Sequence, residues 1–549
     1  MKIRPIQFSA FVTDVAPALK QSGAIRFGVE RECLRCDQSG MIAQTDHPTT
    51  LGATLTHPLI TTDYSEALLE LITPPLDTAD ELLDSLERIH RYVSQNLAEG
   101  ETLWPASMPC RLDGPDSIRI AEYGPSNIGQ MKHIYRRGLE TRYGRTMQSI
   151  AGLHFNFSLS ETFWSSYLAL AGATLAPPPR VTAENGCQSN DDMLRSEAYF
   201  GLIRNFRRWS WLLMYLFGAS PVVDKSFLQQ QPHKLTDFGN ENFGLPWATS
   251  LRMGDIGYKN NAQDSLNICF NHLDSYTQTL YNATHTPYPR YQAIGMKKDG
   301  AYLQLNTHIL QIENEYYSSV RPKRVARSGE KPTAALRRGG VEYIEVRCLD
   351  INPFLPLGAD ADQVSFMELF LVTCLFAKSP YISIEDCHHI DSNFASVVNA
   401  GRQPGLELSV PGEEGYESIA LTSWGHTILD AMQVTADLIA GDVAGRRPED
   451  YAKAISMARA RLEDAALTPS AMVLDQLQDQ RFIDWGLRLA AEHQAELHSQ
   501  RCDAEDRQRF ADAARQSLED AAAIAAADEV DFDTFLERYM ADSPIGEQD

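Results

Sequence analysis

Before about residue 425 the chain carries short segments of alternating apolar and polar residues, and after it the spacing becomes helical. Strict alternation over residues 152–160 predicts a half-buried strand, with His154 and Asn156 on its polar face and phenylalanines on the other. Similar patterns predict further strands at 24–35, 302–320 and 341–350. Spacings of three and four predict helices at 1–22, 61–73, 79–98, 200–221 and 366–379.

The fold expected from these elements is α+β. Several predicted strands have one polar face, which favours an antiparallel sheet over a parallel sheet covered on both sides. Residues 175–192 are rich in Pro, Asn and Asp and predict a surface loop. The last part of the chain is rich in Ala, Glu, Arg and Gln and has few glycines. We therefore expect a catalytic body over 1–425 and a helical C-terminal part over 426–549.

Charge and composition exclude several classes of partner. The 549 residues carry a formal net charge of −24, which repels nucleic acid and anionic membrane surfaces. No run of eighteen apolar residues occurs, and the N-terminus lacks the apolar stretch of a signal peptide. We expect a cytoplasmic protein with no nucleic-acid or membrane partner.

Nine cysteines are scattered along the chain, and Cys33 and Cys36 form its one C-x-x-C pair. A zinc or redox site normally needs further ligands or a second pair nearby, and none is present in the sequence. Free thiols in a reducing compartment are the alternative.

Two charged pairs mark a candidate site. Glu30 and Glu32 are two residues apart in one predicted strand, and Glu345 and Arg347 are two apart in another, so each pair shares a sheet face. A single acid on a strand is usually solvated. Several carboxylates on one face repel one another unless cations neutralise them, and hard oxygen ligands suit Mg²⁺. His154 is a candidate nitrogen ligand or, alternatively, a structural hydrogen-bonding residue.

A basic segment at 320–332 stands out against the acidic background. It carries five cations and one acid, and it joins two of the predicted strands. Such a cluster beside carboxylates suits a nucleoside triphosphate, and a solvated loop is the alternative. No P-loop or dinucleotide-binding motif occurs, so an ATP site would depend on metal ions, basic side chains and an aromatic residue such as Tyr316 or Tyr317.

Several motifs resemble those of the proteobacterial glutamate–cysteine ligases, in the family's order from about residue 24 to about 405: FGVERECLR, LTHPLITTDYSEALLELITP, WPASMPC, GLHFNFS, PWATSLRMGDIGY, LQIENEYYSSVRPKRVARSGE and GGVEYIEVRCLDINPF. The resemblance implies a glutamine-synthetase-like antiparallel sheet bent into a funnel. It also implies the first step of glutathione synthesis: ATP phosphorylates the side-chain carboxylate of L-glutamate, and the amine of L-cysteine attacks the γ-glutamyl phosphate. The products are γ-glutamylcysteine, ADP and phosphate.

The resemblance also assigns roles to individual residues. It implies Mg²⁺, with Mn²⁺ as an alternative ion, held by Glu30, Glu32, Asp63, Glu70, His154 and Glu345. It places Arg347 on the transferred phosphoryl group. Arg252 and Asn156 match glutamate contacts, and Tyr135 and Tyr258 match the cysteine pocket. For ATP it implies Tyr317 near the adenine, and Lys323 and Arg327 near the phosphates.

Two alternatives remain open at this point. One is a γ-glutamyl ligase with a different amine acceptor, and the other is a non-catalytic relative that has kept the fold. We expect small-molecule partners, a monomer, and feedback by glutathione.

Overall fold

The computed structural model describes residues 5–171, 189–229, 232–257, 266, 268–327, 329–413, 415–443, 445–499 and 502–541. Most of the surface loop predicted at 175–192 therefore lies outside the described residues, as do Tyr258 and Cys187. The eight described cysteines, Cys33 and Cys36 among them, are all free.

A seven-stranded antiparallel sheet forms the centre of the molecule. Its strand order is β11-β12-β5-β1-β3-β2, and β4 pairs with the far end of β1. The strands are β1 (Ile25–Asp37), β2 (Ile60–Thr62), β3 (Leu68–Ile72), β4 (Glu101–Leu103), β5 (Leu153–Leu159), β11 (Val320–Lys323) and β12 (Tyr343–Leu349). The expected α+β class and antiparallel sheet are confirmed.

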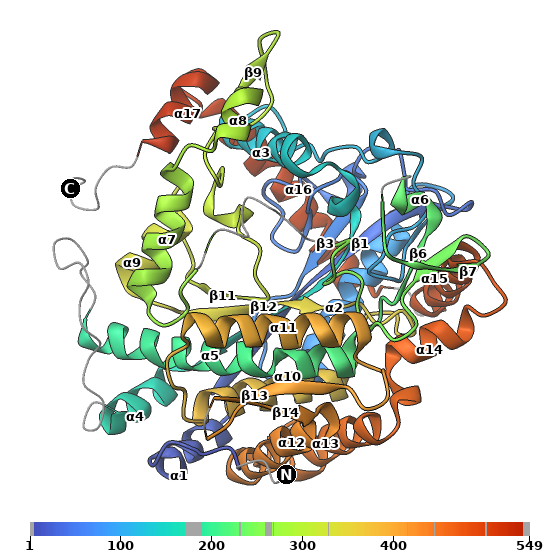
Figure 1. Ribbon diagram of the computed structural model, residues 1–549. Helices are drawn as coiled ribbons and strands as arrows, with labels where there is room; N and C mark the ends of the chain where they lie inside the picture. Colours follow the sequence, from blue (N-terminus) through green and yellow to red (C-terminus); the bar gives the residue numbers. More distant parts are fainter. Residues whose placement is uncertain are drawn as a thin grey trace.

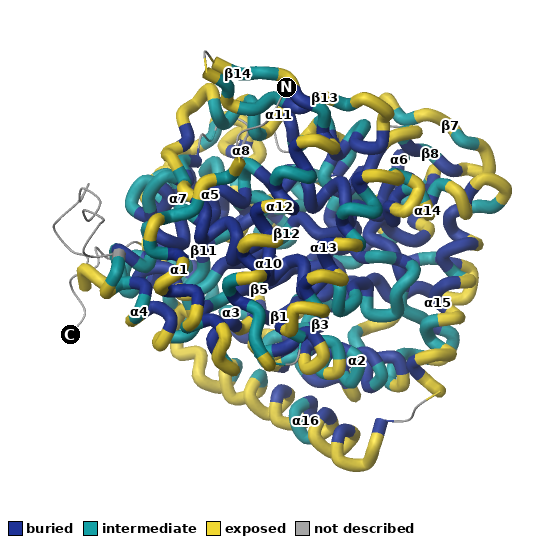
Figure 2. The backbone as a smooth tube through the Cα atoms, turned by 90° about the horizontal axis from the view of Figure 1, so that it is seen from below, coloured by how far each residue is buried: buried dark blue, intermediate teal, exposed yellow. Residues whose placement is uncertain are grey.

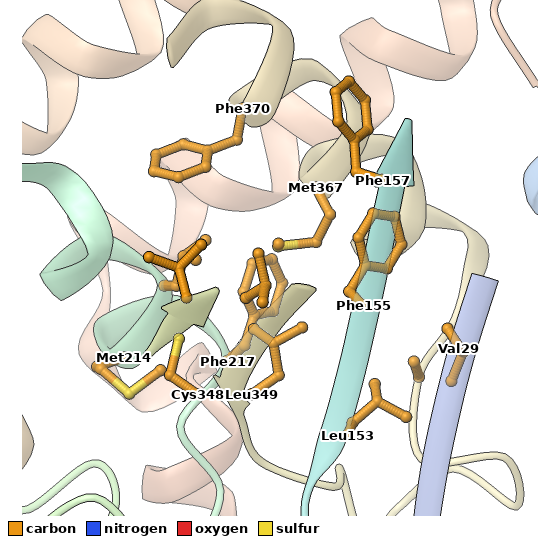
Figure 3. Close-up of a cluster of buried hydrophobic side chains, with 14 of the residues drawn as sticks. Val29, Leu153, Phe155, Phe157, Met214, Phe217, Cys348, Leu349, Met367 and Phe370 are labelled. Carbon is orange, nitrogen blue, oxygen red and sulfur yellow. The ribbon is translucent and has the colours of Figure 1, made fainter. Parts of the chain in front are cut away.

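One face of this sheet packs on helices and forms the main core. In Figure 1, α5 (Asn190–Phe217), α10 (Ala361–Phe376) and α11 (Ile384–Ala400) lie below the β11–β12 edge, while α2 (Ala79–Gln95) packs on β1 and β3. Figure 3 shows Phe155 and Phe157 of β5 pointing to this side, with Met367 and Phe370 of α10. The alternation of β5 therefore leaves His154 and Asn156 on the opposite face.

That opposite face carries α3 (Asn127–Tyr143) and the irregular segment 303–319. Here two sequence predictions are wrong. Residues 61–73 form strands β2 and β3 joined by a turn, and their backbones pair with each other, with Thr61 opposite Glu70. The strand predicted over 302–320 is a loop with one 3₁₀ turn, Glu313–Glu315, followed by β11. The predicted helix over 1–22 is two short pieces, α1 (Val12–Val15) and a 3₁₀ turn at Ala16–Lys20.

The remaining elements before residue 421 surround this body. Two- and three-stranded sheets comprise β6 (Val222–Asp224), β7 (Thr236–Gly239), β8 (Asn242–Gly244), β9 (Lys297–Lys298), β10 (Ala301–Tyr302), β13 (Glu407–Pro411) and β14 (Tyr416–Ala420). The other helices are α4 (Glu161–Ala171), α6 (Lys225–Leu228), α7 (Leu273–His285), α8 (Pro289–Ile294) and α9 (Pro332–Gly339).

From residue 421 the described chain is helical. Its helices are α12 (Leu421–Ile439), α13 (Pro448–Glu463), α14 (Pro469–Gln476), α15 (Phe482–Ser499), α16 (Ala504–Ala526) and α17 (Phe532–Met540). Helices α12 and α13 pack on α10, so they share the main core, whereas α16 runs along the outside with a largely exposed surface (Figure 2). The boundary near residue 425 stays a prediction. Among the described residues, no helix is long and apolar enough to span a membrane.

Candidate active site

A row of polar side chains crosses the sheet on the face opposite the main core. The register pairs Glu30 of β1 with His154 of β5, and Glu32 of β1 with Glu70 of β3. On the other side of β5, Glu345 of β12 pairs with Asn156. Paired residues on neighbouring strands point to the same face, so the sheet itself brings these donors together.

His154 lies at the centre of this row and is 2% exposed. Its Nδ1 is 3.3 Å from Glu30 Oε2 and 3.7 Å from Glu345 Oε1, while its Nε2 is 3.5 Å from Glu32 Oε1. The two ring nitrogens therefore face two different groups of carboxylates. One group is Glu30 and Glu345, and the other is Glu32 and Glu70.

The carboxylates are crowded and largely cut off from water. Burial, followed by repulsion from Glu30 and Asp63, raises the pKa of Glu70 well above its usual value. Burial also raises the pKa of Glu32, although a hydrogen bond from the backbone N–H of Gly152 (2.5 Å) stabilises its charged form. Anions held this close need positive charge nearby.

The donor set fits divalent cations. Each of the two groups offers two carboxylate oxygens and a ring nitrogen whose atoms lie within 4.8 Å of one another. Glu345 Oε2 and Asn156 Oδ1 are buried and accept no hydrogen bond from the described residues, although Lys323 Nζ forms an ion pair with Glu345 Oε2 at 3.4 Å. Carboxylate oxygens with one imidazole suit Mg²⁺ or Mn²⁺ rather than a soft-metal site. Asp63 lines the adjoining cavity.

Two cationic side chains neutralise the β12 end of the row. Arg347 Nη1 donates to Glu345 Oε1 at 2.7 Å, and Lys323 Nζ lies 3.4 Å from Glu345 Oε2. Burial alone would raise the pKa of Glu345, but these two cations hold it well below its usual range. Burial works against the Arg347 charge, yet the surrounding carboxylates raise the pKa of its guanidinium. Arg347 is therefore a fixed positive charge.

A cavity of about 120 Å³ opens beside this row, between the sheet and α3. Arg252 and Arg347 line it together with Glu32, Asp63 and His154, and Arg252 Nη2 donates to the backbone oxygen of Arg347 at 2.7 Å. Tyr135 of α3 lines the cavity, and so does Tyr317, whose hydroxyl lies 2.9 Å from Met253 Sδ. The structure thus places Tyr317 in the same cavity as Tyr135.

Some lining residues had no sequence signal. Arg136, Gln148 and Arg321 also line the cavity. Arg321 pairs with Glu345 across β11 and β12, and it is one of the five cations of the basic segment 320–332 that the sequence marked. Nothing in the sequence marked Arg136 or Gln148.

Arg327 is not among the described residues that line the cavity. Arg327 is exposed, and its backbone N–H donates to Glu330 at 2.8 Å. Tyr258 is outside the described residues.

Comparisons with known proteins agree on one family. The model of the family described as "Glutamate-cysteine ligase" matches residues 14–397. A glutamate–cysteine ligase of Hahella chejuensis is 52% identical over 93% of this chain and 95% of the relative, and one of Pseudomonas entomophila is 48% identical over 94% and 93%. A crystal structure of glutamate–cysteine ligase from Francisella tularensis in complex with AMP superposes with a TM-score of 0.86. It is 32% identical, and the match covers 95% of this chain and 98% of that one.

The family match spans every strand that contributes to the row of polar side chains, from β1 to β12. The relatives extend over nearly the whole chain. This chain belongs to the glutamate–cysteine ligase family.

Proposed function

We propose that this protein uses ATP to join the γ-carboxylate of L-glutamate to the amine of L-cysteine through a γ-glutamyl phosphate. The observation that carries the proposal is the row of buried carboxylates around His154, which ends at Arg347 beside a polar cavity. A carboxylate is a poor electrophile, and phosphorylation gives it a leaving group. Family membership and the AMP complex of the Francisella tularensis relative support ATP use.

Glutamate fits the Arg252 side of the cavity. A guanidinium fork suits a carboxylate, and the backbone contact to Arg347 fixes where the Arg252 fork points. Asn156 donates to Glu30 Oε1 at 2.8 Å, which leaves its Oδ1 as an acceptor for a substrate ammonium group. With its α-groups held there, the glutamate side chain would reach toward Arg347.

The transferred phosphoryl group is negatively charged, so the phosphoryl step needs positive charges beside it. The carboxylates and His154 would hold Mg²⁺. The bound Mg²⁺ would act as a Lewis acid that stabilises the charge on the phosphate oxygens. Arg347 adds a fixed guanidinium on the same face, and Arg321 adds a second one on the neighbouring strand. Both charges are in place before the reaction, so neither has to reorganise as the transition state forms.

The acceptor step uses the α3 side of the cavity. Tyr135 and Tyr317 enclose this part of the cavity, and we assign both to the cysteine pocket. The resemblance implies a place near the adenine for Tyr317 instead, and that role stays a prediction. The cysteine amine attacks the acyl carbon, the C–N bond forms, and phosphate leaves with the electrons of the broken C–O bond.

The test measures ADP release with glutamate, ATP, Mg²⁺ and a panel of amines. We expect cysteine to give the highest kcat/KM and mass spectrometry to detect γ-glutamylcysteine. Equal rates with cysteine and with other amines would contradict cysteine as the acceptor. ADP release that does not depend on glutamate would contradict the ligase assignment itself.

We also propose that the enzyme acts as a monomer in the cytoplasm and is subject to feedback by glutathione. The free state of all eight described cysteines supports a reducing compartment. Glutathione carries the same γ-glutamylcysteine unit as the product, so it is chemically suited to the same cavity.

A further inference from the structure

The C-terminal helix α17 (Phe532–Met540) lies outside residues 14–397 of the family match, yet it packs on α3. Figure 1 shows α17 beside α8 and β9, at the same end of the molecule as α3. Tyr135 and Arg136 of α3 line the active-site cavity. Helix α3 therefore contributes both to the cavity and to the contact with α17.

An apolar cluster joins the two helices. Leu536 of α17 is 3% exposed and belongs to the same cluster as Met131 and Ile134 of α3 and Leu305 of the irregular segment 303–319. Tyr135 packs against this cluster as well. The aromatic ring that lines the cavity thus has α17 side chains in the cluster behind it.

Hydrogen bonds attach the start of α17 and the residues just before it to α3 and to residues 297–302. The Asp528 carboxylate accepts from the backbone N–H of Asn127 at 2.7 Å, and the Val530 carbonyl accepts from Asn127 Nδ2 at 2.9 Å. Both contacts fall on the first turn of α3. Asp533 accepts from Lys297 Nζ at 2.7 Å and from Tyr302 Oη at 2.6 Å.

Gln311 continues these contacts to the cavity. Its side-chain oxygen accepts from the Leu305 N–H at 3.0 Å, and its Nε2 donates to the carbonyl of Tyr135 at 3.2 Å. Its backbone N–H donates to Glu315 Oε2 at 2.7 Å, and Glu315 lines the cavity. The fit is close, because a Cβ added to Gly138 of α3 would lie 1.9 Å from Gln311 Oε1.

We propose that α17 positions the acceptor side of the active site. Leu536 acts as a positioning residue: it packs against α3 and Leu305 and so fixes Tyr135 directly and Glu315 through Gln311. The proposal rests on the function proposed above and on the assignment of Tyr135 to the cysteine pocket. The carboxylate row stands on β1, β3, β5 and β12, whose positions are set by sheet pairing instead.

If α17 positions only the acceptor side, its substitution in the full-length enzyme should change the KM for cysteine and leave the KM for glutamate unchanged. Leu536→Ala should raise the KM for cysteine about tenfold, while the KM for glutamate and the Mg²⁺ affinity stay within about twofold of wild type. Leu536→Met keeps the side-chain volume and should restore the KM for cysteine. Glu537→Ala is the matched control, since Glu537 is an exposed neighbour on the same helix.

Hydrogen exchange supplies a readout that does not depend on activity. Leu536→Ala should speed amide exchange in α3 and in residues 303–312, and leave β1 and β5 unchanged. If Leu536→Ala does not fold, Asp533→Ala provides a second variant, because it removes the contacts to Lys297 and Tyr302.

An unchanged KM for cysteine, an equal rise in every KM, or wild-type exchange in α3 would each overturn the positioning role. Failure of the proposed function gives a different result. The wild-type enzyme would then show no cysteine-dependent ADP release, while the exchange experiment would still test the packing of α17 on α3.

Discussion

Replacing Arg347 with alanine tests the assignment of the phosphoryl-transfer charge most directly. Arg347 Nη1 lies 2.7 Å from Glu345 Oε1, in the row that also contains Glu30, Glu32, Glu70 and His154. An arginine placed on a transferring phosphoryl group contributes about a thousandfold to kcat, or about 4 kcal/mol. We therefore expect Arg347→Ala to lower kcat by about three orders of magnitude in steady-state ADP release.

The same substitution should also weaken the metal-free fold. At 2.7 Å and an effective dielectric constant of about 20, the attraction between Arg347 and Glu345 is about 6 kcal/mol before desolvation. Lys323 remains 3.4 Å from Glu345 and offsets part of the loss, so we expect a net cost of about 3 kcal/mol in urea unfolding. Arg347→Lys keeps the charge and should recover most of this stability without recovering kcat, because an ammonium lacks the planar fork.

Arg204→Ala is the matched control. Arg204 is 4% exposed and its Nη2 lies 2.9 Å from Glu197 Oε1, on α5 and away from the cavity. It should lose comparable stability while kcat stays within about twofold of wild type. If folded Arg347→Ala retained a tenth or more of the wild-type kcat, the role assigned to Arg347 would be refuted.

Three further predictions concern metal, charge crowding and pH. EDTA should stop turnover and lower the melting temperature. Mg²⁺ at a hundred times its Kd should restore both and add about 2.7 kcal/mol to the free energy of unfolding. A melting temperature that does not change with Mg²⁺ would count against a metal site. Glu70→Gln removes one of the crowded charges, so it should stabilise the metal-free protein by about 1 kcal/mol and weaken the Mg²⁺ response in the same melting experiment. An unchanged Mg²⁺ response would show that Glu70 binds no metal. His57 Nδ1 accepts from the N–H groups of Leu59 and Ile60, and burial lowers the pKa of His57 to about 4. The unfolded chain then binds the extra proton, so stability is complete above pH 6.5 and falls as the pH drops toward 4, by about 2 kcal/mol per such group at pH 5. Urea unfolding of His57→Asn should show a smaller loss between pH 7 and pH 5, and an equal loss would exclude His57 as the cause.

Strand alternation allowed much of the site to be predicted from sequence. In β1 and β5 one face is buried in the core, so the period of two placed Glu30, Glu32, His154 and Asn156 on the other face correctly. Glu345 follows from the same rule in β12. The placement of these residues on one face follows from the alternation within each strand and from the strands sharing one sheet, and the sequence contains that alternation.

Residues 61–73 show where this reasoning stops. β3 is short and apolar around Glu70, and a tight turn precedes it, so the acids by chance also fit helical spacing. The strand predicted over 302–320 is a loop instead. Glu315 in this loop pairs with Arg142 at 3.0 Å, a contact between segments more than 170 residues apart that no local pattern encodes. Arg136 was missed for the same reason, since the cavity is defined by how α3 docks on the sheet.

The alternation of β5 has a consequence for how this enzyme can change. Phe155 and Phe157 fill the core (Figure 3), and His154 and Asn156, which alternate with them along β5, face the candidate site. A substitution that shifts the strand to repair packing must therefore shift these two side chains by the same amount. Stability and turnover cannot be tuned independently along this strand, so variants selected for heat resistance should accumulate their substitutions elsewhere, on the outer helices.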